Sequence, residues 1–185
     1  MADFLEKWPS SDMLPMSMGG CTLQSVQPLA ITWIAPFKGE RGRVSNALED
    51  ALGCSWPDPN RFTESNGTRV LSVAQGQILV LGPRVEMEGA AVVDQSDGLI
   101  ALALCGDRAG DVLSRLTSVD LRDAVFKTGH TARTQLRDIT VSLARLDGDR
   151  WVLLIPRSMV EHAIDDIQRA MRGVVARAAL QEKDK

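Results

Sequence analysis

Six polar residues at predicted strand ends and turns are the best candidates for a site in this sequence: Asp94, Ser96, Asp97, Arg133, Arg157 and Ser158. Asp and Ser side chains in turns often bond backbone groups of the same turn. Ser158, followed three residues later by Glu161, fits a capping box at a helix start. Arginines at strand ends often bind a carboxylate through two parallel hydrogen bonds. The pattern favours structural pairing, with an interface or anion-binding role as the alternative.

The sequence shows no group of residues typical of catalysis. His130 and His162 have no second histidine nearby, and each is expected to be solvated or to face a partner. The three cysteines are widely separated, which predicts reduced thiols and no metal site. No glycine-rich dinucleotide fingerprint follows a strand. We therefore predict no catalytic, cofactor-binding or metal-binding residue in this chain.

The composition is that of an ordinary globular protein. The chain has 185 residues, 44% of them hydrophobic, and a formal net charge of −3. This length fits one compact domain or two small halves that share a core. The acidic balance argues against nucleic-acid binding. The N-terminus lacks a signal-peptide pattern and the longest apolar run, 99–105, is too short for a membrane span. We expect a soluble, cytoplasmic protein.

Local patterns predict the elements that must position the polar residues. In the first half, the expected elements are strands at 22–26 and 29–34, a helix over 44–52 ended by Gly53, and a hairpin of 69–73 with 77–81. In the second half, they are strands at 90–93 and 99–104 around the turn 95–98, a helix capped by Asp107, a hairpin of 139–143 with 151–155, and a helix whose apolar face runs over 160–171.

These elements indicate an α+β fold of two small strand-and-helix halves, with antiparallel or mixed sheets and helices packed on one face. The predicted divisions are an N-terminal arm at 1–20, a first half at 21–89, a second half at 90–176 and a charged tail at 177–185. Trp33, Trp56 and Trp151 are expected to anchor the core or an interface. The arm is unusually apolar, and Phe4, Leu5 and Trp8 are its candidate contacts to a partner.

Several short motifs follow one another in the second half. They are Asp94-Gln95-Ser96-Asp97-Gly98, an apolar strand closed by Gly106, Leu113-Ser114-Arg115-Leu116, Val119-Asp120-Leu121-Arg122, Phe126 with Gly129, Arg133-Thr134-Gln135-Leu136 and Arg157-Ser158-Met159. Their order and spacing resemble the gamma subunit of heterotetrameric sarcosine oxidase. The resemblance is close from Asp94 onward and loose before it. One departure is Arg137-Asp138-Ile139, where the family often has a His-Met pair.

The resemblance implies a non-catalytic subunit with an aminomethyltransferase-like fold. The family's complex oxidises sarcosine to glycine, passes the one-carbon unit to tetrahydrofolate and produces hydrogen peroxide. FAD, FMN, NAD and tetrahydrofolate are expected in the large alpha and beta subunits, which would be this chain's partners.

Three alternatives remain open. The departure at Arg137-Asp138-Ile139 allows the equivalent small subunit of a related N-methyl amino acid dehydrogenase, such as N-methylglutamate dehydrogenase. A free-standing folate-binding protein would need Asp94 or Asp97 to face a pterin pocket. A small binding module without an enzyme partner is the third interpretation.

Overall fold

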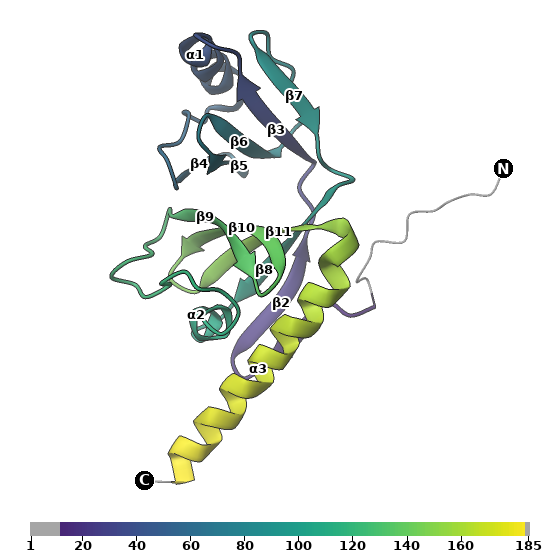
Figure 1. Cartoon of the computed structure of the whole chain (residues 1–185), viewed down its shortest axis with the longest axis vertical. Helices are drawn as coiled ribbons and strands as arrows, with labels where there is room; N and C mark the ends of the chain where they lie inside the picture. The colour runs from purple at the N-terminus through teal and green to yellow at the C-terminus, as the bar shows by residue number, and fades with distance from the viewer. Residues whose placement is uncertain (1–11, 184–185) are drawn as a thin grey trace, which may run out of the picture.

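The protein consists of two antiparallel sheets packed face to face, with helices on both outer faces. The computed structural model describes residues 12–183. Helix α1 covers the upper sheet in Figure 1, and helices α2 and α3 cover the lower one. Each sheet thus has helices on one face only, as the sequence predicts, and the α+β fold is confirmed. No helix among the described residues is both long and apolar enough to cross a membrane.

The larger sheet has six strands in the order β1-β2-β8-β11-β10-β9, and every neighbouring pair is antiparallel. Its strands are β1 (Met16–Met18), β2 (Cys21–Val26), β8 (Leu99–Cys105), β9 (Thr131–Leu136), β10 (Ile139–Asp147) and β11 (Arg150–Pro156). The smaller sheet has five strands in the order β4-β5-β6-β3-β7, also antiparallel. Its strands are β3 (Ala30–Pro36), β4 (Phe62–Ser65), β5 (Thr68–Ala74), β6 (Gln77–Gly82) and β7 (Ala90–Asp94).

The helices begin and end for local reasons. Helix α1 (Arg41–Leu52) ends at Gly53, whose left-handed φ of 66° lets its N–H bond the carbonyl of Glu49. The short α2 (Ala109–Leu113) follows β8. A 3-10 turn, Arg157–Met159, leads into α3 (Val160–Lys183), whose apolar stripe includes Ile164, Ile167 and Met171 and is buried.

The core between the sheets depends on alternation along the central strands. On β8, Ile100, Leu102 and Leu104 face the helices, whereas Ala101 and Ala103 face the other sheet. These two alanines of the six-stranded sheet pack against bulky side chains of the five-stranded sheet: Ile31, Leu71, Leu79 and Leu81. Both faces of β8 are therefore buried, which makes it a central strand.

The halves differ from the predicted divisions, because two strands exchange sheets. Strand β2 lies in the predicted first half but pairs with β8 in the larger sheet. Strand β7 opens the predicted second half but pairs with β3 in the smaller sheet. The turn at 95–98 is thus a crossover between sheets and not a hairpin. Strand β7 does not pair with β8, because both edges of β8 are already paired, one with β2 and the other with β11.

The arm, the tail and the cap of the second helix also differ from the sequence predictions. Residues 16–18 of the predicted arm form β1 on the edge of the larger sheet, while Phe4, Leu5 and Trp8 lie outside the described residues. The predicted tail from 177 is helical to Lys183, because α3 continues past its buried stripe with good helix formers. Helix α2 begins after Arg108 and has no side-chain cap, so Asp107 does not cap it.

Candidate functional site

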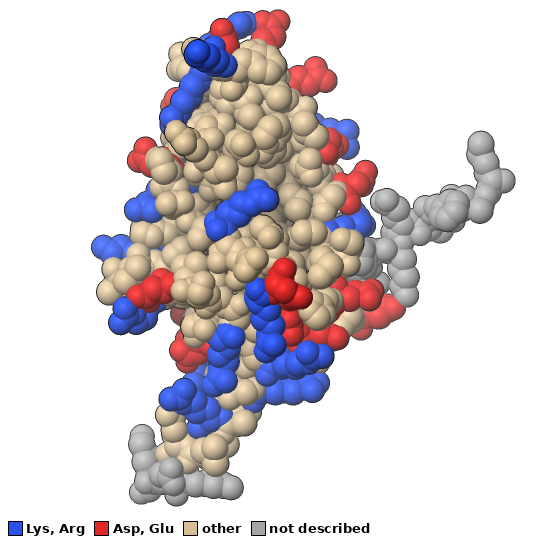
Figure 2. Space-filling view, in the orientation of Figure 1, with Lys and Arg blue, Asp and Glu red and all other residues tan. Residues whose placement is uncertain are grey.

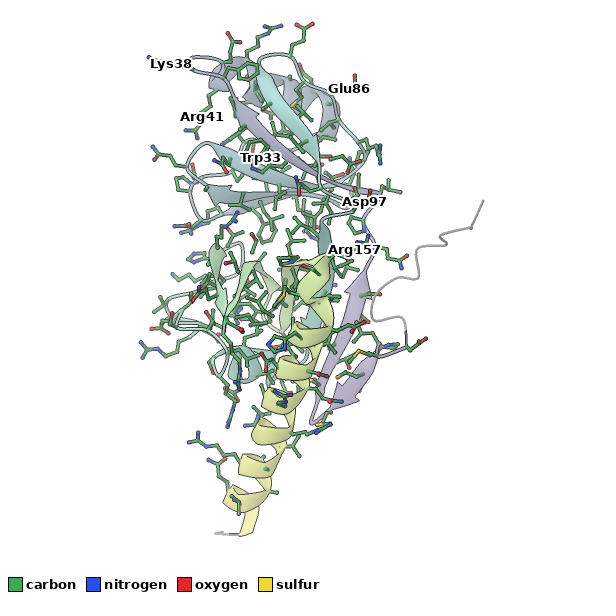
Figure 3. The ribbon with its side chains drawn as sticks, turned by 45° about the vertical axis from the view of Figure 1, so that its right-hand side comes forward. Trp33, Lys38, Arg41, Glu86, Asp97 and Arg157 are labelled. Carbon is green, nitrogen blue, oxygen red and sulfur yellow. The ribbon has the colours of Figure 1, made fainter. Side chains whose placement is uncertain are left out.

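Four of the six predicted polar residues meet where the chain crosses between the sheets. Asp94 ends β7, and Ser96 and Asp97 lie in the connecting turn. Arg157 directly follows β11, on a different segment of the chain. Figure 3 shows Asp97 and Arg157 at the junction of the upper and lower parts of the molecule. These four residues are therefore neighbours in the folded chain.

Within this cluster, Ser96 forms hydrogen bonds with Asp94, at the end of β7, and with Ile31, in β3. Its N–H and Oγ donate to Asp94 Oδ1 at 2.9 Å and 2.6 Å, and its Oγ accepts from the backbone N–H of Ile31 at 3.0 Å. Arg84 pairs with the same carboxylate at 2.6 Å. The hydroxyl of Ser96, with its N–H and then Arg84, lowers the pKa of Asp94 below 3.8. These contacts fix an Asx turn, which is a structural role.

Arg157 fastens the same turn to the end of β11. Its Nε donates to the carbonyl of Asp97 at 2.7 Å, and its Nη2 donates to the carbonyl of Ser96 at 3.4 Å. Its backbone N–H donates to the carbonyl of Gly98 at 2.9 Å. The guanidinium mainly binds backbone carbonyls, and the Asp97 carboxylate is 4.0 Å away. The cluster is thus a clasp between the two sheets.

The other two predicted residues lie apart from this clasp. Arg133 is exposed on β9, the far edge strand of the larger sheet, and forms no ion pair within residues 12–183. Ser158 is exposed in the 3-10 turn, and its side chain forms no hydrogen bond within the same part of the chain. The predicted capping box does not form, because the 3-10 turn begins at Arg157, so Ser158 lies inside the helical segment and not at its start.

One cavity borders the clasp, and a second, larger one shares only its lining residues Gln27 and Pro28. The smaller, about 290 Å³, is lined by Ile31, Leu99, Asp97 and Arg157 among others. Its volume lies at the lower limit for small-molecule sites, and the Asp97 carboxylate is 90% exposed. The larger, about 690 Å³, has Asp50 as its one ionisable lining residue. The lining residues of these two cavities include no buried carboxylate.

Replacing Ser96 with alanine should weaken the clasp in a pH-dependent way. The N–H of Ile31 loses its acceptor, which should cost about 1 kcal/mol of unfolding free energy. The lowered pKa of Asp94 separately stabilises the folded state above pH 3.8. This stabilisation is lost as the pH falls through the folded-state pKa of Asp94. In Ser96→Ala the pKa of Asp94 should rise toward 3.8, as measured by NMR titration.

Ser118→Ala provides the control, since Ser118 is exposed and its side chain has no hydrogen bond within residues 12–183. It should leave the pKa of Asp94 and the unfolding free energy unchanged. A Ser96→Ala variant with an unchanged pKa at Asp94 would contradict the described clasp.

Sequence reasoning missed Arg145, the one buried Arg or Lys among the residues that the structure describes. Its Nη1 and Nη2 donate to the carbonyls of Phe126 and Gly148, each at 2.8 Å, and it pairs with Asp123 at 2.7 Å. The guanidinium lies 5.0 Å from the ring centroid of Trp151. The sequence did contain a pattern that indicates this position. Val141, Leu143 and Arg145 alternate along β10, so Arg145 shares the inward face of the two apolar residues. Its partners are mainly backbone groups, which indicates a structural role.

The two histidines have different surroundings. His130 lies edge-on to the Phe126 ring, 5.5 Å between centroids. Its pKa is lowered by burial and then by the positive charges of Arg61 and Lys127. His162 instead lies beside Asp138 and Asp166, a grouping that the sequence analysis did not predict. The pair His162 and Asp166 was visible at helical spacing, but Asp138 comes from a distant turn.

The two face-to-face sheets with outer helices define an aminomethyltransferase-like α+β fold. The solved structure of the glycine cleavage system aminomethyltransferase T from Bartonella henselae matches with a TM-score of 0.53 and 14% identity, over 81% of this chain and 46% of that one. A chain of the heterotetrameric sarcosine oxidase from Corynebacterium sp. U-96, in complex with pyrrole 2-carboxylate, matches with a TM-score of 0.74 and 24% identity, over 86% of this chain and 87% of that one. No family model and no curated protein matches the sequence.

Proposed function

We propose that this chain is a non-catalytic subunit of a sarcosine-oxidase-type complex, equivalent to its gamma subunit. The observation that carries the proposal is the fold match to a sarcosine oxidase chain over nearly the whole of both chains. By contrast, the chain spans less than half of the aminomethyltransferase that it resembles. The motif order from Asp94 to Met159 supports the same assignment.

The proposed mechanism is structural. The large alpha and beta subunits would carry FAD, FMN, NAD and tetrahydrofolate, and would convert sarcosine to glycine with release of hydrogen peroxide. This chain would bury surface on them and hold them in register, as a subunit of an obligate complex does. The clasp of Asp94, Ser96 and Arg157 supports this role, because its polar groups bind the chain's own backbone and each other.

A basic surface at the end of α3 is our candidate for the contact. In Figure 1, α3 runs past the edge of the larger sheet, and Figure 2 shows Lys and Arg side chains gathered over this region. Residues 168–181 contain Arg169, Arg172 and Arg177 but no acidic residue, although the whole chain is acidic. We define the α3 basic surface as Arg172 and Arg177 on α3 together with Arg115, which follows α2.

Two of its arginines are available for a partner. Arg115 and Arg177 are exposed, form no ion pair with residues 12–181, and line a cavity of about 490 Å³ between α2 and α3. Leu180, 63% exposed, adds an apolar contact on the same helix. Exposed guanidiniums beside an exposed leucine are suited to an acidic surface with an apolar centre. We propose that the large subunits present such a surface.

The test of function is purification of the tagged chain from its native host. Co-purification of two large subunits with flavin absorbance and sarcosine-dependent peroxide production is the expected result. Flavin subunits that oxidise N-methylglutamate but not sarcosine would instead favour the dehydrogenase alternative. A colourless protein without large subunits would overturn the proposal, and titration with tetrahydrofolate would then test the folate-binding alternative.

The contact surface has its own test in the reconstituted complex. The double variant Arg115→Glu/Arg177→Glu should weaken binding to the large subunits about tenfold or more, and high salt should weaken the wild-type complex as well. Lys38→Glu, at the opposite end of the molecule in Figure 3, is a charge-reversal control and is compared with each single variant, Arg115→Glu and Arg177→Glu. Equal effects of Lys38→Glu and the single arginine variants would place the contact elsewhere without disproving the subunit role.

A further inference from the structure

Three metal-ligating side chains meet at one end of the larger sheet, outside the clasp. His162 and Asp166 lie one turn apart on α3, and Asp138 lies in the turn between β9 and β10. His162 Nε2 is 3.7 Å from Asp138 Oδ1 and 3.7 Å from Asp166 Oδ2. One ligand atom from each residue lies within 4.8 Å of the others. In the described part of the chain this is the one group of three of this kind.

Asp166 is the unusual member of this group. The residue is 1% exposed, and its Oδ2 is buried without a hydrogen-bond partner. Its other oxygen, Oδ1, is held at 3.5 Å by both Arg137 Nε and Arg169 Nη1. A buried carboxylate oxygen without a partner is costly, and native proteins rarely leave one. This oxygen points toward His162, so the missing partner belongs between the two side chains.

We propose that Asp138, His162 and Asp166 bind a divalent cation of the zinc type. Separations of 3.7 Å are too long for hydrogen bonds. They suit donors on one ion, since zinc–nitrogen and zinc–oxygen bonds of about 2.0–2.2 Å place neighbouring ligands about 3–4 Å apart. One imidazole and two carboxylates favour zinc over calcium, which takes more oxygen ligands. The fourth position would be filled by water.

The two arginines shape the site without blocking it. By holding Oδ1 they turn Oδ2 toward His162, as outer hydrogen bonds orient a ligating carboxylate in metal sites. Their positive charges oppose a cation, but both side chains are more than half exposed and are therefore screened by solvent. A bound ion would link the β9–β10 turn to α3, the helix that ends in the α3 basic surface. The site does not depend on the proposed subunit role.

The test is a titration of the metal-free full-length chain with Zn²⁺ by calorimetry, and with Co²⁺ by visible absorbance. We expect one ion per chain and a rise in melting temperature with Zn²⁺, because an ion that binds the folded state stabilises it. His162→Gln and Asp166→Asn should each weaken binding by about a hundredfold, since even outer-shell changes cost ~10–100-fold. His130→Gln should bind normally, and His130 is the one other histidine of the sequence.

Asp138→Asn guards against a folding artefact. Asp138 is largely exposed, so this variant should fold as the wild type does and still lose affinity. Absence of a binding heat and of a melting shift with Zn²⁺ would overturn the proposal and leave the cluster as an ion-pair network. Unchanged affinity in folded Asp138→Asn and His162→Gln, or sulfur charge-transfer bands with Co²⁺, would also overturn it and point to the cysteines.

Discussion

Replacing Gly106 with alanine should lower the free energy of unfolding by roughly 3 kcal/mol or more. Gly106 follows β8 with a φ of +125°, a conformation that alanine rarely adopts. A Cβ at this position would lie 2.0 Å from the carbonyl oxygen of Gly20 and 2.9 Å from the Cα of Cys21. Both obstacles are backbone atoms at the start of β2, so relief would require the β2–β8 pairing to open.

Gly39→Ala is the matched control for this prediction. Gly39 also has a positive φ, of +88°, but a Cβ added there would have no neighbouring atom within 4 Å. Alanine there should therefore cost only the conformational term, about 1 kcal/mol. Urea unfolding monitored by circular dichroism gives both values. Equal losses in the two variants would show that the close approach of β2 to Gly106 is not a feature of the folded protein.

Replacing Trp151 with alanine is the second large effect, and should cost about 3–5 kcal/mol. Trp151 is 1% exposed on β11 and belongs to the core beneath α2 and α3. Its ring stacks on Phe126 with 5.5 Å between centroids, and the guanidinium of Arg145 lies over it. Alanine would leave a large cavity, and would also remove the ring that covers the buried Arg145 charge.

Trp151→Phe separates volume from polarity at the same position. The indole Nε1 is buried without a hydrogen-bond partner in the structure. Phenylalanine therefore loses no hydrogen bond, keeps an aromatic face for Phe126 and Arg145, and leaves a smaller cavity than alanine, so the cost should be well below that of Trp151→Ala. Urea unfolding of both variants measures the difference. A phenylalanine variant as unstable as the alanine variant would mean that Nε1 has a partner.

The candidate site was partly predictable from the sequence. Contacts between residues close in the sequence could be predicted, and contacts between distant segments could not. Asp94, Ser96 and Asp97 stand together in one turn, so their mutual contacts are local. The placement of Arg157 beside them depends on β11 pairing with β8, a contact that joins distant segments. Arg133 matched the same reasoning by residue type, yet it lies on the far edge strand. Residue type indicated the chemistry, but only strand order determined which residues meet.

The sequence by itself determined the local elements of this protein. Alternating apolar residues with the Asp147-Gly148-Asp149 turn specified the β10–β11 hairpin, and the apolar stripe of α3 with its helical spacing specified the last helix. Gly53 ended α1 as predicted. In each case the determining residues lie within a few positions of one another, so the backbone conformation follows from local sterics and burial.

Only the tertiary structure decided which elements share a sheet and which distant side chains meet. Strands β2 and β7 exchange sheets because β8, apolar on both faces, must be paired on both edges. The meeting of Asp138 with His162 and Asp166 follows from the packing of α3 across the β9–β10 turn. Such contacts depend on how complete surfaces fit together, and a pattern read over a short window of sequence does not contain that information.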